Sequence, residues 1–319
     1  MFNVPIFEKT KSCEKILLAG MGGGYDVYCA LPIFFALKKS GVNVCLASFS
    51  FSDIEHCKSS KRLSPTLAGI SAEDENLTPY FPEYHLTKWF REELGEEETI
   101  WCFHKTGAKP LQENYRLLKD HLDFDGLILV DGGVDSLVRG NEEQTASLIE
   151  DALSLFAADT LEDLKLSITA ITAFGVELGL SFGQILENMA ALIKKDCFLG
   201  NCMLVKSFAE YQLYESAVLY CQGQAYQDPS VINSSIISAV RGEFGNYHLT
   251  KKTMGSQLQI NPLMSQYWFF ETSGVAGQNQ YLSQLGFSET FMDAMGVFMS
   301  VRGFLPARKP HNQAIHWRF

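Results

Sequence analysis

Short apolar runs that alternate with helical patterns constrain the fold of this chain more than any other feature. The runs are Lys15–Ala19, Asn43–Phe49, Thr99–His104, Gly126–Val130 and Lys165–Ile171. The helical patterns cover approximately Asp26–Ser40, Leu111–His121, Glu142–Ala157 and Phe182–Lys195. A strand that is followed by a helix and a second strand makes a right-handed crossover, which keeps the two strands parallel. We therefore predict an α/β fold with a Rossmann-like, doubly wound and mainly parallel sheet.

The alternation is interrupted once and then stops. Ser52–Glu98 is polar, acidic and proline-bearing, and we interpret it as an insertion with one short helix around Leu86–Leu94. Met264–Glu271 is aromatic and fits either a strand or a buried segment. Further helical patterns without a crossover rhythm occur at Leu204–Gln222, at Val231–Arg241 and from Phe287. We predict a ligand-binding core over 1–199 with the acidic insertion at 52–98, and a mainly helical C-terminal part over 200–319 packed on this core.

The first apolar run ends in a glycine-rich loop, Gly20-Met-Gly-Gly-Gly-Tyr-Asp26, which opens the next helix. Glycine lets the backbone turn tightly and lets a ligand approach the N–H groups. The helix N-terminus adds a partial positive charge that suits a phosphate or a carboxylate. The candidate ligand-binding residues are therefore Gly20, Gly22, Gly23 and Gly24. The alternative is a tight strand-to-helix turn that binds nothing.

A second loop, Asp131-Gly-Gly-Val-Asp135, follows the fourth apolar run. Two carboxylates separated by glycines suit a divalent cation such as magnesium, a ribose diol or general-base chemistry. Asp131 and Asp135 are therefore candidate catalytic and metal-binding residues, and Gly132 and Gly133 are candidate cofactor-binding residues. The alternative is an acid that caps the following turn. Glu177, after the fifth run, is either a third acid that binds the cofactor or a solvated loop residue.

These loops should lie together at one edge of the sheet. Each follows the carboxyl end of a strand, and open parallel sheets bind ligands along that edge, where the strand order reverses. If the five runs are arranged in the order 3-2-1-4-5, the first and fourth strands are neighbours at this point. Asp26, Asp131 and Asp135 should then face one crevice, with Asp26 as a candidate catalytic base.

The glycine loop departs from two common nucleotide-binding patterns. A P-loop would end in Gly-Lys-Ser/Thr, which this loop does not contain. A nicotinamide site usually has an acidic residue at the end of the second strand, whereas the first acid after that strand is Asp53. An ordinary dinucleotide site is therefore disfavoured, and a methyltransferase-type cofactor site has the same weakness.

Charge and composition argue against several classes of partner. The net charge of −11, without a long basic run, disfavours nucleic-acid binding, because neutralising phosphates needs clustered Lys and Arg. No run of about 20 apolar residues occurs, so we predict no membrane span. The chain opens without a signal-peptide pattern and its eight cysteines form no CxxC pair, so we expect reduced thiols and a cytoplasmic location. A homo-oligomer is compatible with these features.

Two stretches of the sequence resemble the uncharacterised family called domain of unknown function 1152. They are Leu17–Val27, with Ala30-Leu-Pro32 behind it, and Val130–Leu137, with Gly140 following. The likeness extends from about Lys15 to Arg308. It implies a Rossmann-like core and no assigned reaction.

The sequence leads to one main hypothesis and two alternatives. The main hypothesis is a small-molecule enzyme, a hydrolase or group transferase, that acts on a phosphate-, ribose- or carboxylate-bearing metabolite. The first alternative is a non-catalytic sensor or binding protein for a nucleotide-like metabolite. An enzyme should show carboxylates with perturbed pKa values in the crevice, whereas a sensor need not. The second alternative is a methyltransferase- or dehydrogenase-like cofactor enzyme, in which another acid such as Asp53 reaches the ribose.

Overall fold

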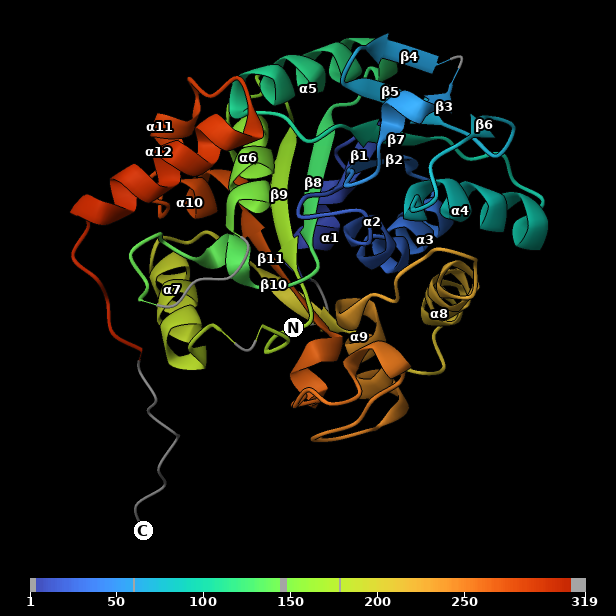
Figure 1. Cartoon of the computed structure of the whole chain (residues 1–319). Coiled ribbons are helices and arrows are strands. Elements are labelled where there is room, and N and C mark those ends of the chain that lie inside the picture. Colours follow the sequence, from blue (N-terminus) through green and yellow to red (C-terminus); the bar gives the residue numbers. More distant parts are fainter. Residues whose placement is uncertain (1–3, 60, 144–147, 178, 311–319) are drawn as a thin grey trace.

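A nine-stranded sheet forms the centre of the molecule, which the computed structural model describes at residues 4–59, 61–143, 148–177 and 179–310 (Figure 1). In spatial order, the strands are β10 (Phe198–Met203), β11 (Gln266–Glu271), β9 (Leu166–Ile171), β8 (Gly126–Asp131), β1 (Lys15–Gly20), β2 (Asn43–Phe49), β7 (Ile100–Phe103), β5 (Leu67–Ile70) and β4 (Lys61–Ser64). A separate antiparallel pair consists of β3 (Cys57–Lys58) and β6 (Glu75–Asn76).

Helices pack on both faces of the large sheet (Figure 1). They are α1 (Pro5–Thr10), α2 (Asp26–Cys29), α3 (Leu31–Lys39), α4 (Pro82–Trp89), α5 (Ala108–Leu122), α6 (Leu148–Asp159), α7 (Phe182–Lys194), α8 (Ala209–Gln222), α9 (Val231–Arg241), α10 (Thr272–Ala276), α11 (Leu282–Leu285) and α12 (Phe291–Phe304). Short 3-10 segments are η1 (Ile54–His56), η3 (Asp135–Leu137), η4 (Lys251–Thr253) and η5 (Pro262–Ser265), and the π-helical turn η2 (Phe90–Leu94) continues α4.

The strands formed by the five apolar runs are adjacent and parallel, in the order β7-β2-β1-β8-β9. The prediction that these runs form parallel strands of one sheet is therefore confirmed. Counted along the chain, the five strands have the order 3-2-1-4-5, which is the order that we had assumed, with its reversal beside β1. The complete sheet is mixed rather than parallel, because the strand pairs at its two ends are antiparallel. The loops that follow β1 and β8 therefore leave the sheet side by side.

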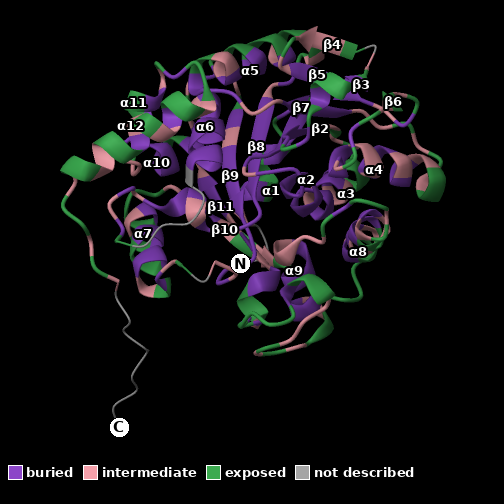
Figure 2. Ribbon diagram, in the orientation of Figure 1, coloured by how far each residue is buried: buried purple, intermediate pink, exposed green. Residues whose placement is uncertain are grey.

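The central strand β1 is buried on both faces, which accounts for its continuous apolar sequence. Its side chains alternate between two hydrophobic clusters. Ile16 and Leu18 pack with residues of α3 and α8, whereas Leu17 and Ala19 pack with residues of α5 and α6. Figure 2 shows the central strands as buried and the exposed residues mainly on the outer helices and loops. The loops at the carboxyl edge therefore rest on a rigid base.

The segment at 52–98 contains more regular structure than the one short helix that we predicted. Its described residues include the strands β3 to β6, and β4 and β5 form a hairpin that adds to β7 in the main sheet. Its helix begins at Pro82 rather than near Leu86. The prediction missed these strands because they are short and are stabilised by pairing with β7, which no local pattern reveals.

Several predicted helix boundaries need correction, and the helix predicted from Leu204 begins at Ala209. The helix predicted over Asp26–Ser40 is divided at Ala30 into α2 and α3, because Pro32 in the first turn of α3 cannot donate a backbone hydrogen bond and crowds the preceding turn. The helix predicted from Glu142 is described from Leu148, and its expected residues 144–147 lie outside the described part. The last helix begins at Phe291 instead of Phe287, because the hydroxyl of Thr290 and the carboxylate of Asp293 form a capping box there.

The C-terminal part contributes strands as well as helices. β11 confirms the strand alternative for the aromatic run at Met264–Glu271, and it pairs with β9. β10 was not predicted, because it is a half-exposed strand at the end of the sheet and contains Gly200 and Asn201. Both strands extend the same sheet that carries the glycine loop.

The cysteines and helices agree with two expectations from composition. All eight cysteines are unpaired, as predicted. Burial raises the pKa of the Cys29 and Cys102 thiols well above the ordinary value. Within the described part, none of the helices combines the length and the apolar character that crossing a bilayer requires.

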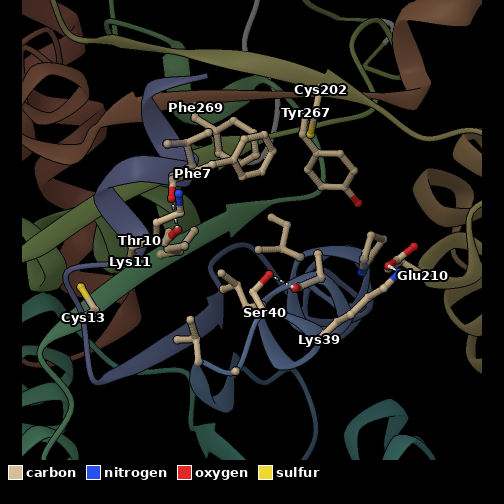
Figure 3. A pocket seen from close by; sticks show the side chains of 18 of the residues that line it. Phe7, Thr10, Lys11, Cys13, Lys39, Ser40, Cys202, Glu210, Tyr267 and Phe269 are labelled. Atoms are coloured by element: carbon tan, nitrogen blue, oxygen red, sulfur yellow. Dashed lines mark hydrogen bonds and ion pairs between the residues drawn. The ribbon is translucent and has the colours of Figure 1, made fainter. Parts of the chain in front are cut away.

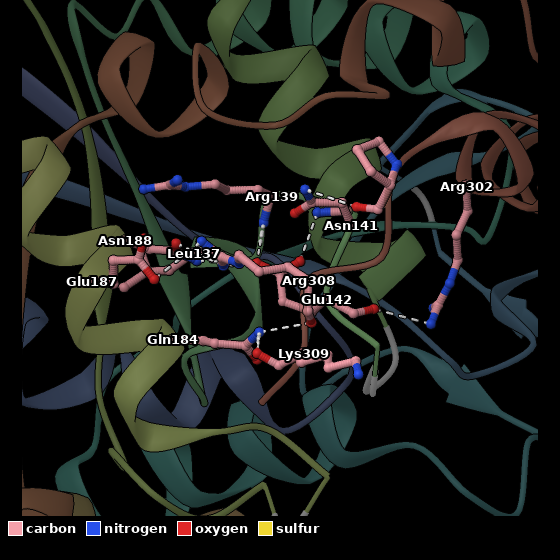
Figure 4. A network of polar contacts seen from close by, with 12 residues as sticks. Leu137, Arg139, Asn141, Glu142, Gln184, Glu187, Asn188, Arg302, Arg308 and Lys309 are labelled. Atoms are coloured by element: carbon pink, nitrogen blue, oxygen red, sulfur yellow. Dashed lines mark hydrogen bonds and ion pairs between the residues drawn. The ribbon is translucent and has the colours of Figure 1, made fainter. Parts of the chain in front are cut away.

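The last described residues run back beside the loop that follows β8 and are fixed there by Arg308 (Figure 4). The guanidinium group of Arg308 contacts the carboxylate of Glu142 at 2.5 Å and donates to Oδ1 of Asn188 at 2.9 Å. The backbone N–H of Arg308 also donates to the carbonyl oxygen of Asn141 at 2.7 Å. The Glu142 side chain is only 1% exposed, so its carboxylate depends on the ion pair with Arg308 in place of contact with water.

Replacing Arg308 with alanine should lower the free energy of unfolding by about 1–2 kcal/mol. The loss should be smaller than that of a pair in the deep core, because the tail can move away and let water reach Glu142. Urea unfolding would measure this difference. Arg91→Ala, which removes an exposed ion pair with Glu97, should cost much less. Equal losses in the two variants would contradict this account of the tail.

Candidate functional site

Asp26 is held at the start of α2 by the glycine loop that precedes it. Its Oδ2 atom accepts a hydrogen bond from the backbone N–H of Gly22 at 2.8 Å. A Cβ atom on Gly132, in the loop after β8, would lie 2.5 Å from Oδ1 of Asp26. A Cβ atom on Gly20 would lie 2.4 Å from the backbone nitrogen of Val27. The predicted glycines therefore allow the two loops to close around a buried carboxylate.

Asp131 is the last residue of β8, and the chain that follows the strand orients its carboxylate. Oδ2 accepts hydrogen bonds from the backbone N–H of Ser136 at 3.1 Å and from its hydroxyl at 2.5 Å. These contacts fit the capping role that was the alternative to a binding role. They use only Oδ2, and Oδ1 lies beside Gly133. Asp131 can therefore stabilise its own loop and still offer an oxygen to a ligand.

Asp151, on α6, completes a group of three buried aspartates with Asp26 and Asp131. One carboxylate oxygen from each residue lies within 4.8 Å of the other two. Asp151 is 3% exposed, and its Oδ1 atom has no hydrogen-bond partner among the described residues. A Cβ atom on Gly22 would lie 2.4 Å from this oxygen. The elements α2, β8 and α6 thus converge at the carboxyl edge of the sheet (Figure 1).

The other two predicted acids, Asp135 and Glu177, lie beside this group. Oε1 of Glu177 accepts a hydrogen bond from the backbone N–H of Val134 at 3.0 Å. A Cβ atom on Gly133 would lie 1.9 Å from the same oxygen, so only glycine leaves room for it. Asp135 is half-buried at the start of η3. Of the three aspartates that we expected to share a crevice, Asp26 and Asp131 belong to the tight group, and Asp135 lies at its side.

Burial raises the pKa of the acids in this region, because an ionised carboxylate loses its water there. It raises the pKa of Asp131 to about 6 and those of Asp26 and Glu177 to about 8, and the charge of Asp131 contributes to the last two shifts. The pKa values of Asp135 and Asp151 are also well above the ordinary value, through burial and then through neighbouring carboxylates. The group therefore holds protons near neutral pH, and a bound cation would displace them.

Asp151 is a member of the group that was not predicted as a site residue. No local motif marks it, since it is one acid within a predicted helix, where acids usually face solvent. A signal was nevertheless present, because the helix Leu148–Asp159 is mostly apolar. Such a helix is usually buried on most sides, so an acid within it is a candidate for burial.

Glu83, on α4, is a second buried acid that was not predicted, and its carboxylate lies at the carboxyl end of β2. Its Oε1 accepts a hydrogen bond from the hydroxyl of Ser48 at 2.9 Å, and its Oε2 has no partner in the described part of the chain. A Cβ atom on Gly24 would lie 3.3 Å from Oε2. Burial raises the pKa of Glu83 to about 7. Asp53, the acid that the sequence suggested for this place, is exposed and contacts His56 at 2.7 Å.

A large cavity lies away from this site, at the amino end of β1 and β2 (Figure 3). It has a volume of about 960 Å³, and its lining is mainly apolar, with Phe7, Leu37 and Phe269 among the residues. Beside the acids there is a slot of only about 10 Å³, lined by residues that include Val134 and Glu177. This slot reaches Glu177, whereas none of the three aspartates of the group is among its lining residues.

The group of three aspartates fits a hard divalent cation. Mg²⁺, Mn²⁺ and Ca²⁺ prefer oxygen ligands, and carboxylates are the usual charged ones. Three carboxylates this close need a positive charge or a proton between them. Oδ1 of Asp151, for which the described part of the chain offers no hydrogen-bond partner, is an oxygen that a cation would satisfy. The residues that could hold the cation are therefore Asp26, Asp131 and Asp151.

Comparison with known proteins gives one match. A family model described as a protein of unknown function, DUF1152, matches residues 82–304. This segment includes Asp131, Asp135, Asp151 and Glu177, and it begins after the glycine loop. No curated protein and no solved structure matches the chain.

Proposed function

The chain belongs to the DUF1152 family, whose function is unknown, and we propose that it is a divalent-cation-dependent enzyme. It would act as a hydrolase or group transferase on a metabolite that carries a phosphate, ribose or carboxylate group. One observation carries this proposal: carboxylate oxygens of Asp26, Asp131 and Asp151 lie within 4.8 Å of one another in a buried site.

The cost of burying these acids supports a functional role for them. Charged side chains are rarely buried without a partner of opposite charge, because they lose hydration. The pKa values of Asp131 and Asp26 are raised to about 6 and about 8, and shifts of this kind are common in catalytic and binding sites. Carboxyl groups with raised pKa values are also what we expected in an enzyme, whereas a simple sensor does not need them.

The neighbouring residues would position the metabolite. The N–H of Gly22 is already donated to Asp26, so an anionic group would rest on Gly23 and Gly24. Asp135 and Glu177 lie beside the cation ligands, where they could accept hydrogen bonds from sugar hydroxyls or take up a proton. Asp26, as the third ligand, would lose its proton when the cation binds.

A Rossmann-like, doubly wound fold is part of this proposal. The strand order β7-β2-β1-β8-β9 and the helices on both faces support it. Ligands of such folds bind where the strand order reverses. Asp26 follows β1 and Asp131 ends β8, the two strands that flank this reversal.

Titration of the metal-free protein with Mg²⁺ or Mn²⁺ would test the proposal. We expect the cation to raise the unfolding temperature and to bind more tightly at pH 8 than at pH 6, because the carboxylates lose their protons in this range. Asp131→Asn should weaken binding by at least roughly 10- to 100-fold, the loss seen even for residues that only support metal ligands. Calorimetry would measure both effects.

Asp120→Asn provides the control for this titration, because Asp120 is an exposed acid on α5. This variant should bind the cation as the unmodified protein does. Normal cation binding by Asp131→Asn would instead mean that Asp131 only caps its loop. In that case the carboxylate group would not be a cation site.

A second candidate function is the binding of a ribose-bearing cofactor or nucleotide-like metabolite, by a sensor or by a methyltransferase- or dehydrogenase-like enzyme. Glu83 favours this second function, because its carboxyl group accepts a hydrogen bond from Ser48 of β2 and lies beside Gly24. Acids at this end of the second strand bind ribose in dinucleotide sites. Native mass spectrometry of the purified protein would detect such a ligand, and Glu83→Gln should reduce its retention.

A further inference from the structure

Lys105 lies at the carboxyl edge of the sheet, two residues after the end of β7. Its ammonium group contacts the carboxylate of Glu150 at 3.2 Å. It also lies over two aromatic rings, 3.8 Å from the ring centroid of Phe291 and 4.9 Å from that of Phe51. The face of an aromatic ring carries partial negative charge and therefore attracts an ammonium group that lies over it. Segments far apart in the sequence therefore combine to hold one lysine at the site edge.

Two chains of contacts connect Lys105 with the glycine loop and the aspartates. Glu150, its ion-pair partner, precedes Asp151 directly in α6. Phe51, one of its aromatic neighbours, packs against the glycine loop, since a Cβ atom on Gly23 would lie 3.1 Å from its ring. Phe51 thus lies between Lys105 and the glycine loop, and Glu150 joins Lys105 to the helix that carries Asp151.

The ammonium group of Lys105 retains capacity to bind a ligand. An ammonium group has three N–H donors, and among the described residues Glu150 supplies the one hydrogen-bond acceptor. The Lys105 side chain is 36% exposed, whereas that of Glu150 is 10% exposed. A ligand can therefore approach the remaining N–H groups from the solvent side.

The charge of the site explains why a cationic side chain is needed there. Asp26, Asp131 and Asp151 would repel an anionic metabolite, and a divalent cation offsets only part of their charge. Additional positive charge beside the glycine loop would allow an anionic group to approach the cation. Lys105 supplies this positive charge, and Phe51 and Phe291 partly shield its ammonium group from water.

We propose that Lys105 binds the anionic group of the metabolite, and that this group is a phosphoryl group shared between Lys105 and the cation held by the three aspartates. This inference rests on the proposed function and names its substrate class. A phosphoryl group has several oxygens in a tetrahedral arrangement, so one oxygen can reach the cation while another accepts from Lys105. Mg²⁺ is commonly bound by carboxylates together with substrate phosphates.

Phosphate binding to the Mn²⁺-loaded protein tests the inference directly. Mn²⁺ enhances the relaxation of a nearby phosphorus nucleus, so ³¹P NMR reports both binding and proximity to the cation. We expect inorganic phosphate to bind the loaded protein, and Lys105→Met to weaken this binding by roughly 10- to 100-fold, as for a lost hydrogen bond between charged groups. Lys105→Arg, which keeps the charge, should retain most of the affinity.

Lys109→Met is the matched control, because Lys109 lies four residues further along and forms an exposed ion pair with Glu289 at 2.6 Å. This variant should bind phosphate normally. Mn²⁺ affinity and unfolding temperature should be similar in all these variants, which confirms that each is folded. Acetate, which carries a single carboxylate, should compete only weakly with phosphate.

The possible outcomes separate the two proposals. If the protein binds Mn²⁺ but Lys105→Met binds phosphate as tightly as the unmodified protein, the role of Lys105 is refuted and the cation site stands. If acetate binds as well as phosphate, the phosphoryl assignment is refuted. If the unmodified protein binds no Mn²⁺, the proposed function and this inference fail together at the first step.

Discussion

Replacing Asp151 with asparagine should stabilise the cation-free protein at pH 8 and, at the same time, abolish its stabilisation by Mg²⁺. Asp151 is buried and its pKa is raised well above the ordinary value, by burial and by Asp135 and Asp131. Its ionised form is therefore unfavourable in the folded protein. Asparagine has the same size and no charge, so it removes the repulsion together with a cation ligand. Opposite effects on stability and binding are typical of functional residues.

The sign of the effect depends on pH. The ordinary pKa of an aspartate is 3.8, whereas burial raises that of Asp26 to about 8 and that of Asp131 to about 6. Between about pH 4 and pH 8 the folded protein therefore binds more protons than the unfolded chain, and this contribution to stability falls as the pH rises. Each unit of pKa corresponds to about 1.4 kcal/mol. The pKa of Asp151 is raised in the same direction, so we expect Asp151→Asn to gain stability at pH 8 and to gain much less at pH 4.

Urea unfolding at pH 4 and pH 8, with a chelator and then with Mg²⁺, would measure these effects. Asp120→Asn, a change at an exposed position of α5, should alter neither the pH dependence nor the response to Mg²⁺. If Asp151→Asn is instead less stable at pH 8 and still responds to Mg²⁺, the carboxylate of Asp151 has a structural role and is not a cation ligand.

Replacing Gly20 with alanine should have the largest effect on stability of any change considered, about 3 kcal/mol or more. Its Cβ atom would lie 2.4 Å from the backbone nitrogen of Val27 and 2.7 Å from the backbone carbon of Asp26. Backbone atoms at a helix start cannot move aside as a flexible side chain can. The glycine loop and α2 would have to shift together, and Asp26 would lose its place in the group of three aspartates.

Guanidinium unfolding would measure the loss, with Gly296→Ala as the control. Gly296 lies in α12, and a Cβ atom there would meet nothing within 4 Å. Alanine should be neutral or stabilising at that position by up to about 1 kcal/mol, since glycine is unfavourable inside a helix. If Gly20→Ala is as stable as Gly296→Ala, the close approach of α2 to β1 does not constrain the loop.

Much of the candidate site could be predicted from the sequence because it depends on chain direction. Asp26 follows β1 and Asp131 ends β8, and parallel strands place such residues at one edge of a sheet. The close approach of Gly132 to Asp26 agrees with the expectation that the two loops meet. Asp151 could not be found in this way, because its place in the group depends on how α6 packs across β8.

The sequence by itself determined the five parallel strands and the common edge of the loops that follow them, whereas the order of the strands, and with it the meeting of the loops after β1 and β8, was only assumed until the structure showed it. The strands and their common edge follow from apolar runs buried on both faces and from the handedness of the crossovers, which are local properties of the chain. Only the tertiary structure decided the antiparallel edge strands and the places of Asp151, Glu83 and Lys105. Each of these depends on contacts between segments far apart in the chain, such as Lys105 with Glu150 and Phe291. Their free energy comes from pairing and burial, which no short stretch of sequence contains.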